Sequence, residues 1–217
     1  MSQRPLGCLF EVVETLVLTV VIFLVIQTFV AQPYRVEQES MQHTLEQGQY
    51  VLVDKLTPRF GPYARGDIVV FEPPEGGSVP FIKRVIGLPG DKVEIRDGAV
   101  FVNGTELVEP YIYDGDTTLP TGEESSYVVP PEQLFVMGDH RGNSTDSRVF
   151  GAIPVSNVIG RAWLRYWPID TLSILRRPEY PGLGSTGALP PRPADRVAAT
   201  GSAGRVTGRP LNAVRAA

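Results

Sequence analysis

The stretch PFIKRVIGLPGDKVEIRDGAVFVNG, residues 80–104, decides the fold class of this chain. Apolar runs of strand length alternate in it with turns that contain Gly, Pro and Asp, a pattern typical of β-strands. Asp97-Gly98 is the strongest turn signal, because a two-residue hairpin turn needs a positive φ and this dipeptide adopts it readily. The stretch therefore predicts a β-hairpin across Asp97-Gly98.

The same pattern continues on both sides of this stretch. Further apolar runs of strand length lie at 50–56, 67–73, 133–139 and 158–168. No helical period lasts more than a turn or two beyond residue 45. We therefore expect a mostly β fold, with one β-rich domain over residues 32–176.

Two segments depart from the strand pattern. Residues of about 105–132 are rich in Asp, Gly, Thr, Pro, Glu and Ser, which predicts an insert, either a long surface loop or a small subdomain. Residues 177–217 contain mostly Pro, Gly, Ala, Ser, Thr and scattered Arg, with almost no apolar cluster to bury. This composition predicts a disordered tail.

The N-terminal region contains one long apolar segment, VVETLVLTVVIFLVIQTFVA, residues 12–31. Its length approaches the ~20 residues that cross a bilayer, so we expect one transmembrane signal anchor after a short cytoplasmic segment, 1–11. A cleaved secretory signal is the alternative, but the run exceeds a signal core and Phe29 stands where cleavage after Ala31 needs a small residue. A buried soluble helix is a second alternative, although no polar face is visible.

The composition excludes some classes of site. The 217 residues carry a net charge of −4, which gives no basic patch for nucleic acid. Cys8 is the only cysteine, so neither an intrachain disulfide nor a thiolate zinc site can form. With two histidines, His43 and His140, we expect no metal and no cofactor.

Ser40 and Lys83 are candidates for nucleophilic chemistry, but local spacing barely separates them from ordinary residues. A lysine acts as a general base only where burial lowers its pKa. Strand alternation places Lys83 on one apolar face and Arg84 on the other, so either could be the solvated side. Ser40 could equally cap a turn. The charged residues Asp139, Arg141, Asp146 and Arg148 could be a surface ion-pair cluster.

Four segments in order carry a stronger signal: SMQHTL (40–45), RGDIVVF (65–71), IKRVIGLPGD (82–91) and GDHRGNSTDSR (138–148). Together with the N-terminal span, they resemble the boxes of the bacterial type I signal peptidases, over roughly residues 12–168. The resemblance implies a membrane-bound serine endopeptidase with a β catalytic domain. It would remove signal peptides from exported preproteins by cutting after small residues of the Ala-x-Ala type.

The resemblance also implies roles for individual residues. Ser40 corresponds to the nucleophile and Lys83 to its general base, and Ser144 to the serine that orients the lysine. Gln38 stands at the position of an oxyanion donor. Arg84, Asp146 and Arg148 correspond to residues that brace the site.

Location and partners follow from the same resemblance. The N-terminus would lie in the cytoplasm and the catalytic domain on the extracytoplasmic side of the cell membrane. We expect preprotein signal peptides and the lipid bilayer as partners, no nucleic acid, and a monomer.

Four positions depart from the family pattern: His43 replaces proline, His140 asparagine, Gly142 a frequent aspartate, and Gln38 the usual Ser or Gly. Three alternatives to the Ser-Lys signal peptidase stay open. One is a histidine-based site that uses His43 or His140, and another is a self-cleaving Ser-Lys peptidase. The third is an inactive, membrane-tethered homologue that acts as a binding module.

Overall fold

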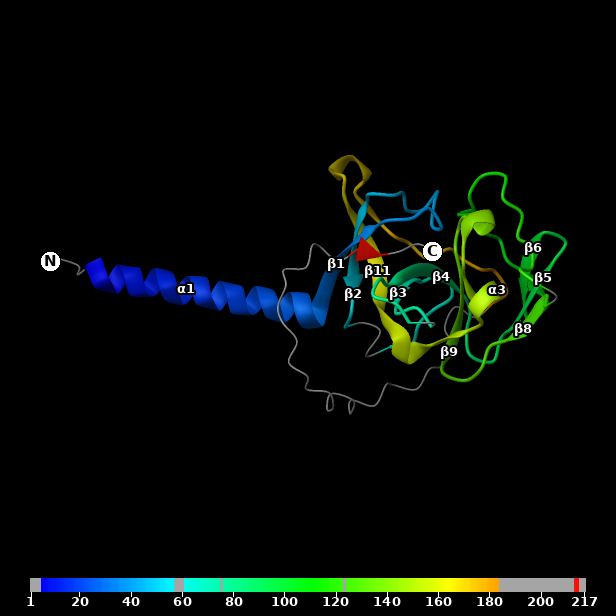
Figure 1. Ribbon diagram of the computed structural model, residues 1–217, viewed down its shortest axis with the longest axis horizontal. Helices are drawn as coiled ribbons and strands as arrows, with labels where there is room; N and C mark the ends of the chain where they lie inside the picture. The colour runs from blue at the N-terminus through cyan, green and yellow to red at the C-terminus, as the bar shows by residue number, and fades with distance from the viewer. Residues whose placement is uncertain (1–4, 57–60, 75, 123, 184–212, 215–217) are drawn as a thin grey trace.

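The computed structural model describes residues 5–56, 61–74, 76–122, 124–183 and 213–214. One long helix, α1 (Pro5–Val25), projects from a β-rich domain (Figure 1). A π-helical turn, Ile26–Val30, follows α1 and leads directly into β1 (Ala31–Val36). The predicted mostly β fold is confirmed.

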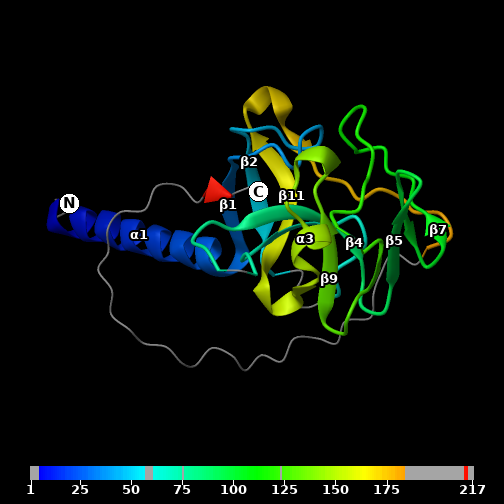
Figure 2. The same cartoon turned by 45° about the vertical axis from the view of Figure 1, so that its right-hand side comes forward.

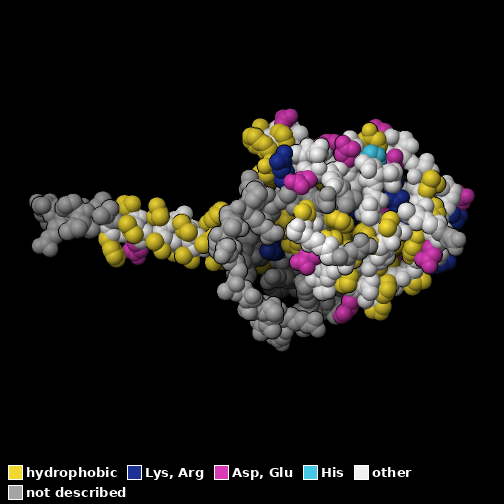
Figure 3. Space-filling view, in the orientation of Figure 1, with side chains coloured by type: hydrophobic (Ala, Val, Ile, Leu, Met, Phe, Trp, Pro, Cys, Tyr) yellow, Lys and Arg dark blue, Asp and Glu magenta, His cyan; other side chains and the backbone are white. Residues whose placement is uncertain are grey.

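The N-terminal helix agrees only in part with the predicted anchor. The apolar segment is helical, but the α-helix begins at Pro5 and ends at Val25, and Ala31 already belongs to β1. Its large apolar side chains from Phe10 to Ile26 are exposed, and they line the helix in Figure 3. Among the described residues, no helix combines the length and hydropathy of a membrane span.

The main sheet has the strand order β10-β9-β4-β3-β11-β2-β1-β13, and β12 pairs with β11. Neighbouring strands are antiparallel except β1 and β13. The strands other than β1 are β2 (Tyr50–Asp54), β3 (Ile68–Phe71), β4 (Phe81–Gly87), β9 (Gln133–Met137), β10 (Ile153–Pro154), β11 (Val158–Trp167), β12 (Ser173–Ile174) and β13 (Ala213–Val214).

A second sheet has the order β7-β6-β5-β8 and lies on the side of the domain away from α1 (Figure 2). Its strands are β5 (Lys92–Arg96), β6 (Ala99–Val102), β7 (Thr105–Glu106) and β8 (Ser126–Val128). Arg96 pairs with Ala99, so the hairpin predicted at Asp97-Gly98 is confirmed. Both turn residues have positive φ, 54° and 81°. Two strands, β7 and β8, come from the segment predicted as an insert.

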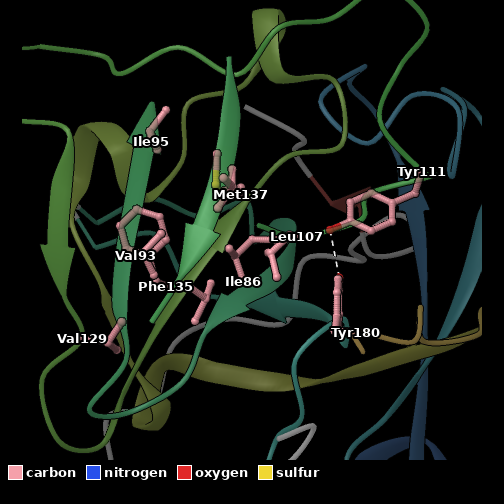
Figure 4. Close-up of a cluster of buried hydrophobic side chains, with 11 residues drawn as sticks. Ile86, Val93, Ile95, Leu107, Tyr111, Val129, Phe135, Met137 and Tyr180 are labelled. Atoms are coloured by element: carbon pink, nitrogen blue, oxygen red, sulfur yellow. Dashed lines mark hydrogen bonds between the residues drawn. The ribbon is translucent and has the colours of Figure 1, made fainter. Parts of the chain in front are cut away.

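One buried cluster joins the two sheets (Figure 4). Ile86 and Phe135 come from the main sheet, and Val93 and Ile95 from the second. Such dry contact removes apolar surface from water and stabilises the second sheet on the first. The second sheet thus packs against β4 and β9, the strands next to the candidate site.

The region predicted as a tail begins with ordered contacts. Tyr180 belongs to the cluster of Figure 4, and its hydroxyl lies 2.9 Å from that of Tyr111. Arg177 donates a hydrogen bond to Asp67. Residues 184–212 and 215–217 lie outside the described residues, and the predicted disorder there stays a prediction.

Candidate active site

The structure places Ser40 and Lys83 in direct contact. Ser40 precedes a turn in which the Leu45 N–H donates to the Met41 carbonyl, and Lys83 lies within β4, opposite Val69 of β3. The Lys83 Nζ donates to the Ser40 Oγ at 2.6 Å, and both residues are 0% exposed. Side chains that the sequence places 43 residues apart thus meet as a buried hydroxyl–amine pair.

Burial changes the charge of the amine. It lowers the pKa of Lys83 from 10.5 to about 7, because the charged form loses its hydration; the carboxylates of Asp146 and Asp139 oppose this and Arg148 adds to it. A substantial fraction of Lys83 is therefore neutral at neutral pH. A neutral amine next to a hydroxyl can accept its proton, so the pair has the chemistry of a nucleophile and its base.

Arg84, the neighbour that the sequence could not separate from Lys83, has a different environment. Its guanidinium pairs with Asp139, donates to the Gly66 carbonyl at 3.1 Å and lies 3.8 Å from the ring centre of Tyr111. Burial alone lowers the pKa of Arg84, but Asp139 more than offsets this and leaves the pKa raised. Arg84 thus stays charged and cannot act as the base. The idea that one of the two side chains is solvated is wrong, since both are buried.

Ser144, Asp146 and Arg148 form a second hydrogen-bonded group, in which the two charged residues are buried and Ser144 is half-buried. Ser144 Oγ donates to Asp146 Oδ2 at 2.8 Å, and Arg148 binds both carboxylate oxygens at 2.8 Å. Burial raises the pKa of Asp146, but Arg148 and the Gly138 N–H more than offset this, so the pKa is lowered. The prediction of a surface ion-pair cluster formed by Asp139, Arg141, Asp146 and Arg148 is wrong. Both aspartates are fully buried, and both arginines are nearly so.

Gly138 brings this group next to the nucleophile. A Cβ on Gly138 would overlap both Ser144 Oγ and the carbonyl oxygen of Ser40. The sequence suggested only a turn at this glycine, whereas the structure requires it for close approach. Asp139 and Thr44 were likewise missed as site residues; Thr44 Oγ1 donates to Asp139 Oδ2 at 2.5 Å.

Two pockets share Thr145 in their lining. A polar pocket of about 350 Å³ contains Gln38 and Ser144; its lining residues are Glu37, Gln38, Glu39, Gln47, Asn143, Ser144 and Thr145. A more apolar pocket of about 400 Å³ is lined by Pro73, Pro74, Gly76, Gly77, Ser78, Val79, Phe81, Thr145, Val149 and Phe150, the last two from the short helix α3 (Ser147–Phe150). The Lys83 Nζ lies 5.5 Å from the ring centre of Phe81, one of the residues that line this pocket.

Both histidines lie against the insert. His43 Nδ1 lies 3.8 Å from Asp114, and His140 stacks on Tyr113 with its Nε2 3.9 Å from Asp116. The Ser40 hydroxyl is instead bound by Lys83, so a histidine-based site gains no support. The described residues contain no group of three His, Cys, Asp or Glu side chains placed to hold a metal ion, and the expected absence of a metal stays a prediction.

The chain is similar in sequence to known proteins. A family model described as signal peptidase, peptidase S26, matches residues 9–167. A signal peptidase I of Leptolyngbya laminosa is 41% identical over 177 residues, which cover 78% of this chain and 85% of that protein. A probable signal peptidase I-1 of Synechocystis sp. is 42% identical over 165 residues, 73% of this chain and 82% of that protein.

Among solved structures, a signal peptidase I from Enterococcus faecalis V583 is 37% identical and covers 45% of this chain and 93% of that one, with a TM-score of 0.39. The family match spans most of the chain, and the curated relatives match most of their own length. The chain therefore belongs to the signal peptidases of the peptidase S26 family.

Proposed function

We propose that Ser40 and Lys83 form the catalytic dyad with which this S26 serine endopeptidase removes signal peptides. The observation that carries the proposal is the 2.6 Å contact between Lys83 Nζ and Ser40 Oγ, two side chains that are both fully buried. The lowered pKa of Lys83, about 7, supports it, because the amine must be neutral to act as a base.

The proposed reaction has two halves. Neutral Lys83 takes the Ser40 hydroxyl proton while Oγ attacks the carbonyl carbon of the scissile bond. The resulting ammonium then donates that proton to the leaving amine, and the mature protein departs from an acyl-enzyme on Ser40. In the second half, Lys83 takes a proton from water as its oxygen attacks the ester carbonyl, and then returns that proton to the departing Ser40 Oγ, which frees the signal peptide and regenerates the dyad.

The surrounding residues have supporting roles in this proposal. The backbone N–H of Ser40 and the amide of Gln38, which lines the polar pocket, are candidate donors to the oxyanion. Ser144, held by Asp146, would orient the amine of Lys83. Arg84, Asp146 and Arg148 hold the buried charges that keep these side chains in place.

Substrate and location rest on the family. The substrates are preproteins with signal peptides, and we propose cleavage after small residues of the Ala-x-Ala type. The family is membrane-anchored, and the exposed apolar side chains of α1 support anchoring through this helix. We further propose a cytoplasmic N-terminus, an extracytoplasmic catalytic domain and a monomer that needs neither cofactor nor nucleic acid.

The test is cleavage of a preprotein with an Ala-x-Ala site by the purified full chain in detergent or lipid. Ser40→Ala and Lys83→Ala should abolish cleavage, while His43→Ala and His140→Ala retain it. If Lys83→Ala keeps full cleavage activity and a histidine variant loses it, the base is a histidine and the proposed dyad is wrong. Absence of cleavage in every lipid and detergent would favour the binding module. Mass spectrometry of the enzyme itself detects self-cleavage.

A further inference from the structure

One loop of the insert, Tyr113–Asp116, lies against the catalytic turn, residues 138–144, which ends at Ser144. The loop is closed by a hydrogen bond from the Asp116 N–H to the Tyr113 carbonyl, 3.0 Å. The Tyr113 N–H donates to the Asp139 carbonyl at 3.1 Å, and Asp116 Oδ2 accepts the Gly142 N–H at 3.1 Å. The loop therefore holds the turn at both ends.

The middle of the turn is also covered by this loop. The imidazole of His140 stacks on the ring of Tyr113, with 4.3 Å between ring centres and 25° between planes. Its Nδ1 is buried and has no hydrogen-bond partner in the described part of the chain, whereas its Nε2 faces Asp116 Oδ2 at 3.9 Å. The orientation of His140 is thus set by the loop, through Tyr113 on one side and Asp116 on the other.

The opposite face of the same turn contacts the dyad. The His140 N–H donates to the Ser40 carbonyl at 3.0 Å, and Gly138 lies so close to Ser40 and Ser144 that no side chain fits between them. A shift of this turn would therefore move the nucleophile and Ser144 together. Small misplacements at a reacting centre have large effects on rate, since the reacting atoms must be held in a narrow geometry.

Asp116 occupies space that residue 142 leaves free. A Cβ on Gly142 would lie 3.3 Å from Asp116 Oδ1 and 3.9 Å from its Cγ. The carboxylate is only 16% exposed, so it belongs to the packed surface of the turn and is not a freely solvated charge. Gly142 does not have a positive φ, so its backbone accepts a side chain once that space is vacant.

We propose that Asp116 is a positioning residue for the Ser40–Lys83 dyad: the insert supplies from a distant segment the carboxylate that braces the catalytic turn. The inference rests on the proposed function, because it concerns the same dyad. The insert then contributes to catalysis, in addition to supplying β7 and β8 of the second sheet.

The experiment measures kcat and KM on a signal-peptide substrate for Asp116→Ala, Asp116→Asn and the double variant Asp116→Ala/Gly142→Asp. We expect Asp116→Ala to lower kcat about tenfold with KM within about twofold, since Asp116 acts on the turn at the dyad and lines neither pocket. Asp116→Asn keeps an acceptor for the Gly142 N–H and should lose less. The double variant should recover most of the lost kcat, because a carboxylate then returns from residue 142.

Asp114→Ala is the matched control, since Asp114 lies in the same loop, its side chain is 94% exposed, and its carboxylate lies 3.8 Å from His43 Nδ1. Its kcat should stay within about twofold of the parent. Equal kcat in Asp116→Ala and Asp114→Ala would overturn the inference. So would an Asp116→Ala/Gly142→Asp enzyme that regains the thermal midpoint of the parent without regaining its kcat. Ser40→Ala in the same assay separates the two proposals: if it stays active, the dyad itself fails, whatever Asp116 does.

Discussion

Arg84 and Asp139 form a two-point ion pair inside the domain, with Nε 2.8 Å from Oδ1 and Nη2 2.6 Å from Oδ2. The side chains are 2% and 0% exposed. The pair joins β4 to the turn after β9, and Thr44 of the nucleophile turn contacts both partners. The segment that carries Ser40 is thus tied to the strand that carries Lys83 by a charge pair behind the dyad.

Removing one partner of this pair should be costly. We expect Arg84→Met to lower the free energy of unfolding by about 3–5 kcal/mol, because it leaves the Asp139 carboxylate buried without its counter-charge. Arg96→Met is the control, since the Arg96–Asp97 pair is exposed and its loss should change stability by less than about 1 kcal/mol. Denaturant unfolding measures both, and equal losses would show that the buried pair is not special.

The activity of the enzyme should fall in acid. Lys83 has a pKa of about 7 and must be neutral to accept the Ser40 proton, so kcat/KM should rise with pH through a midpoint near 7. The pH profile on a peptide substrate checks this. His43→Ala should show the same fall of kcat/KM in acid, the acid limb of the profile. If this limb disappears in His43→Ala, the group that titrates is the histidine.

Asp146 should tune that midpoint. Its negative charge raises the pKa of Lys83, while Arg148 lowers it. Asp146→Asn should therefore move the acid limb of kcat/KM to lower pH, even though lost positioning of Ser144 reduces the maximum rate. Asp170→Asn, a charge change at an exposed position, serves as control and should leave the limb in place. A shift of the Asp146→Asn limb to higher pH would contradict the electrostatic account.

The buried amine should also cost stability. The pKa of Lys83 falls from 10.5 to about 7 on folding, so between these values the unfolded chain binds more protons and stability rises with pH. Lys83→Met removes this cost and should raise the free energy of unfolding at pH 6.5, by an amount on the order of a few kcal/mol.

The gain of Lys83→Met should shrink towards pH 10, where the lysine of the unfolded chain also loses much of its charge. Lys92→Met is the matched control, because the Lys92 side chain is 53% exposed. Chemical unfolding at the two pH values measures the difference. A Lys83→Met gain that equals the Lys92→Met gain, or that does not depend on pH, would refute the linkage.

Gly138 should be intolerant of a methyl group. In Gly138→Ala the new Cβ would overlap Ser144 Oγ and the Ser40 carbonyl, so we expect kcat to fall by about 100-fold or more. Gly160→Ala provides the contrast, since its Cβ would overlap the Asp54 backbone in the sheet and should lower the thermal midpoint. A folded Gly138→Ala enzyme with the parent kcat would show that the close approach is dispensable.

Local signals predicted the β fold well and the site poorly. The Asp97-Gly98 turn was predictable because its information lies within two residues. Lys83 and Arg84 could not be separated, since the feature that separates them, Asp139, lies 55 residues from Arg84. Only the order of the four boxes placed Ser40 with Lys83. The helix bounds differed because hydropathy selects apolar residues, whereas helical hydrogen bonding starts earlier, at Pro5.

The junction between α1 and β1 has a geometric consequence. The Ala31 N–H donates to the Ile26 carbonyl, so the strand starts within hydrogen-bonding reach of the helix end and no loose linker separates them. The six residues of β1 span about 20 Å, and Ser40 follows four residues later. With α1 as the proposed membrane anchor, β1 fixes how far the nucleophile Ser40 can lie from the end of the helix.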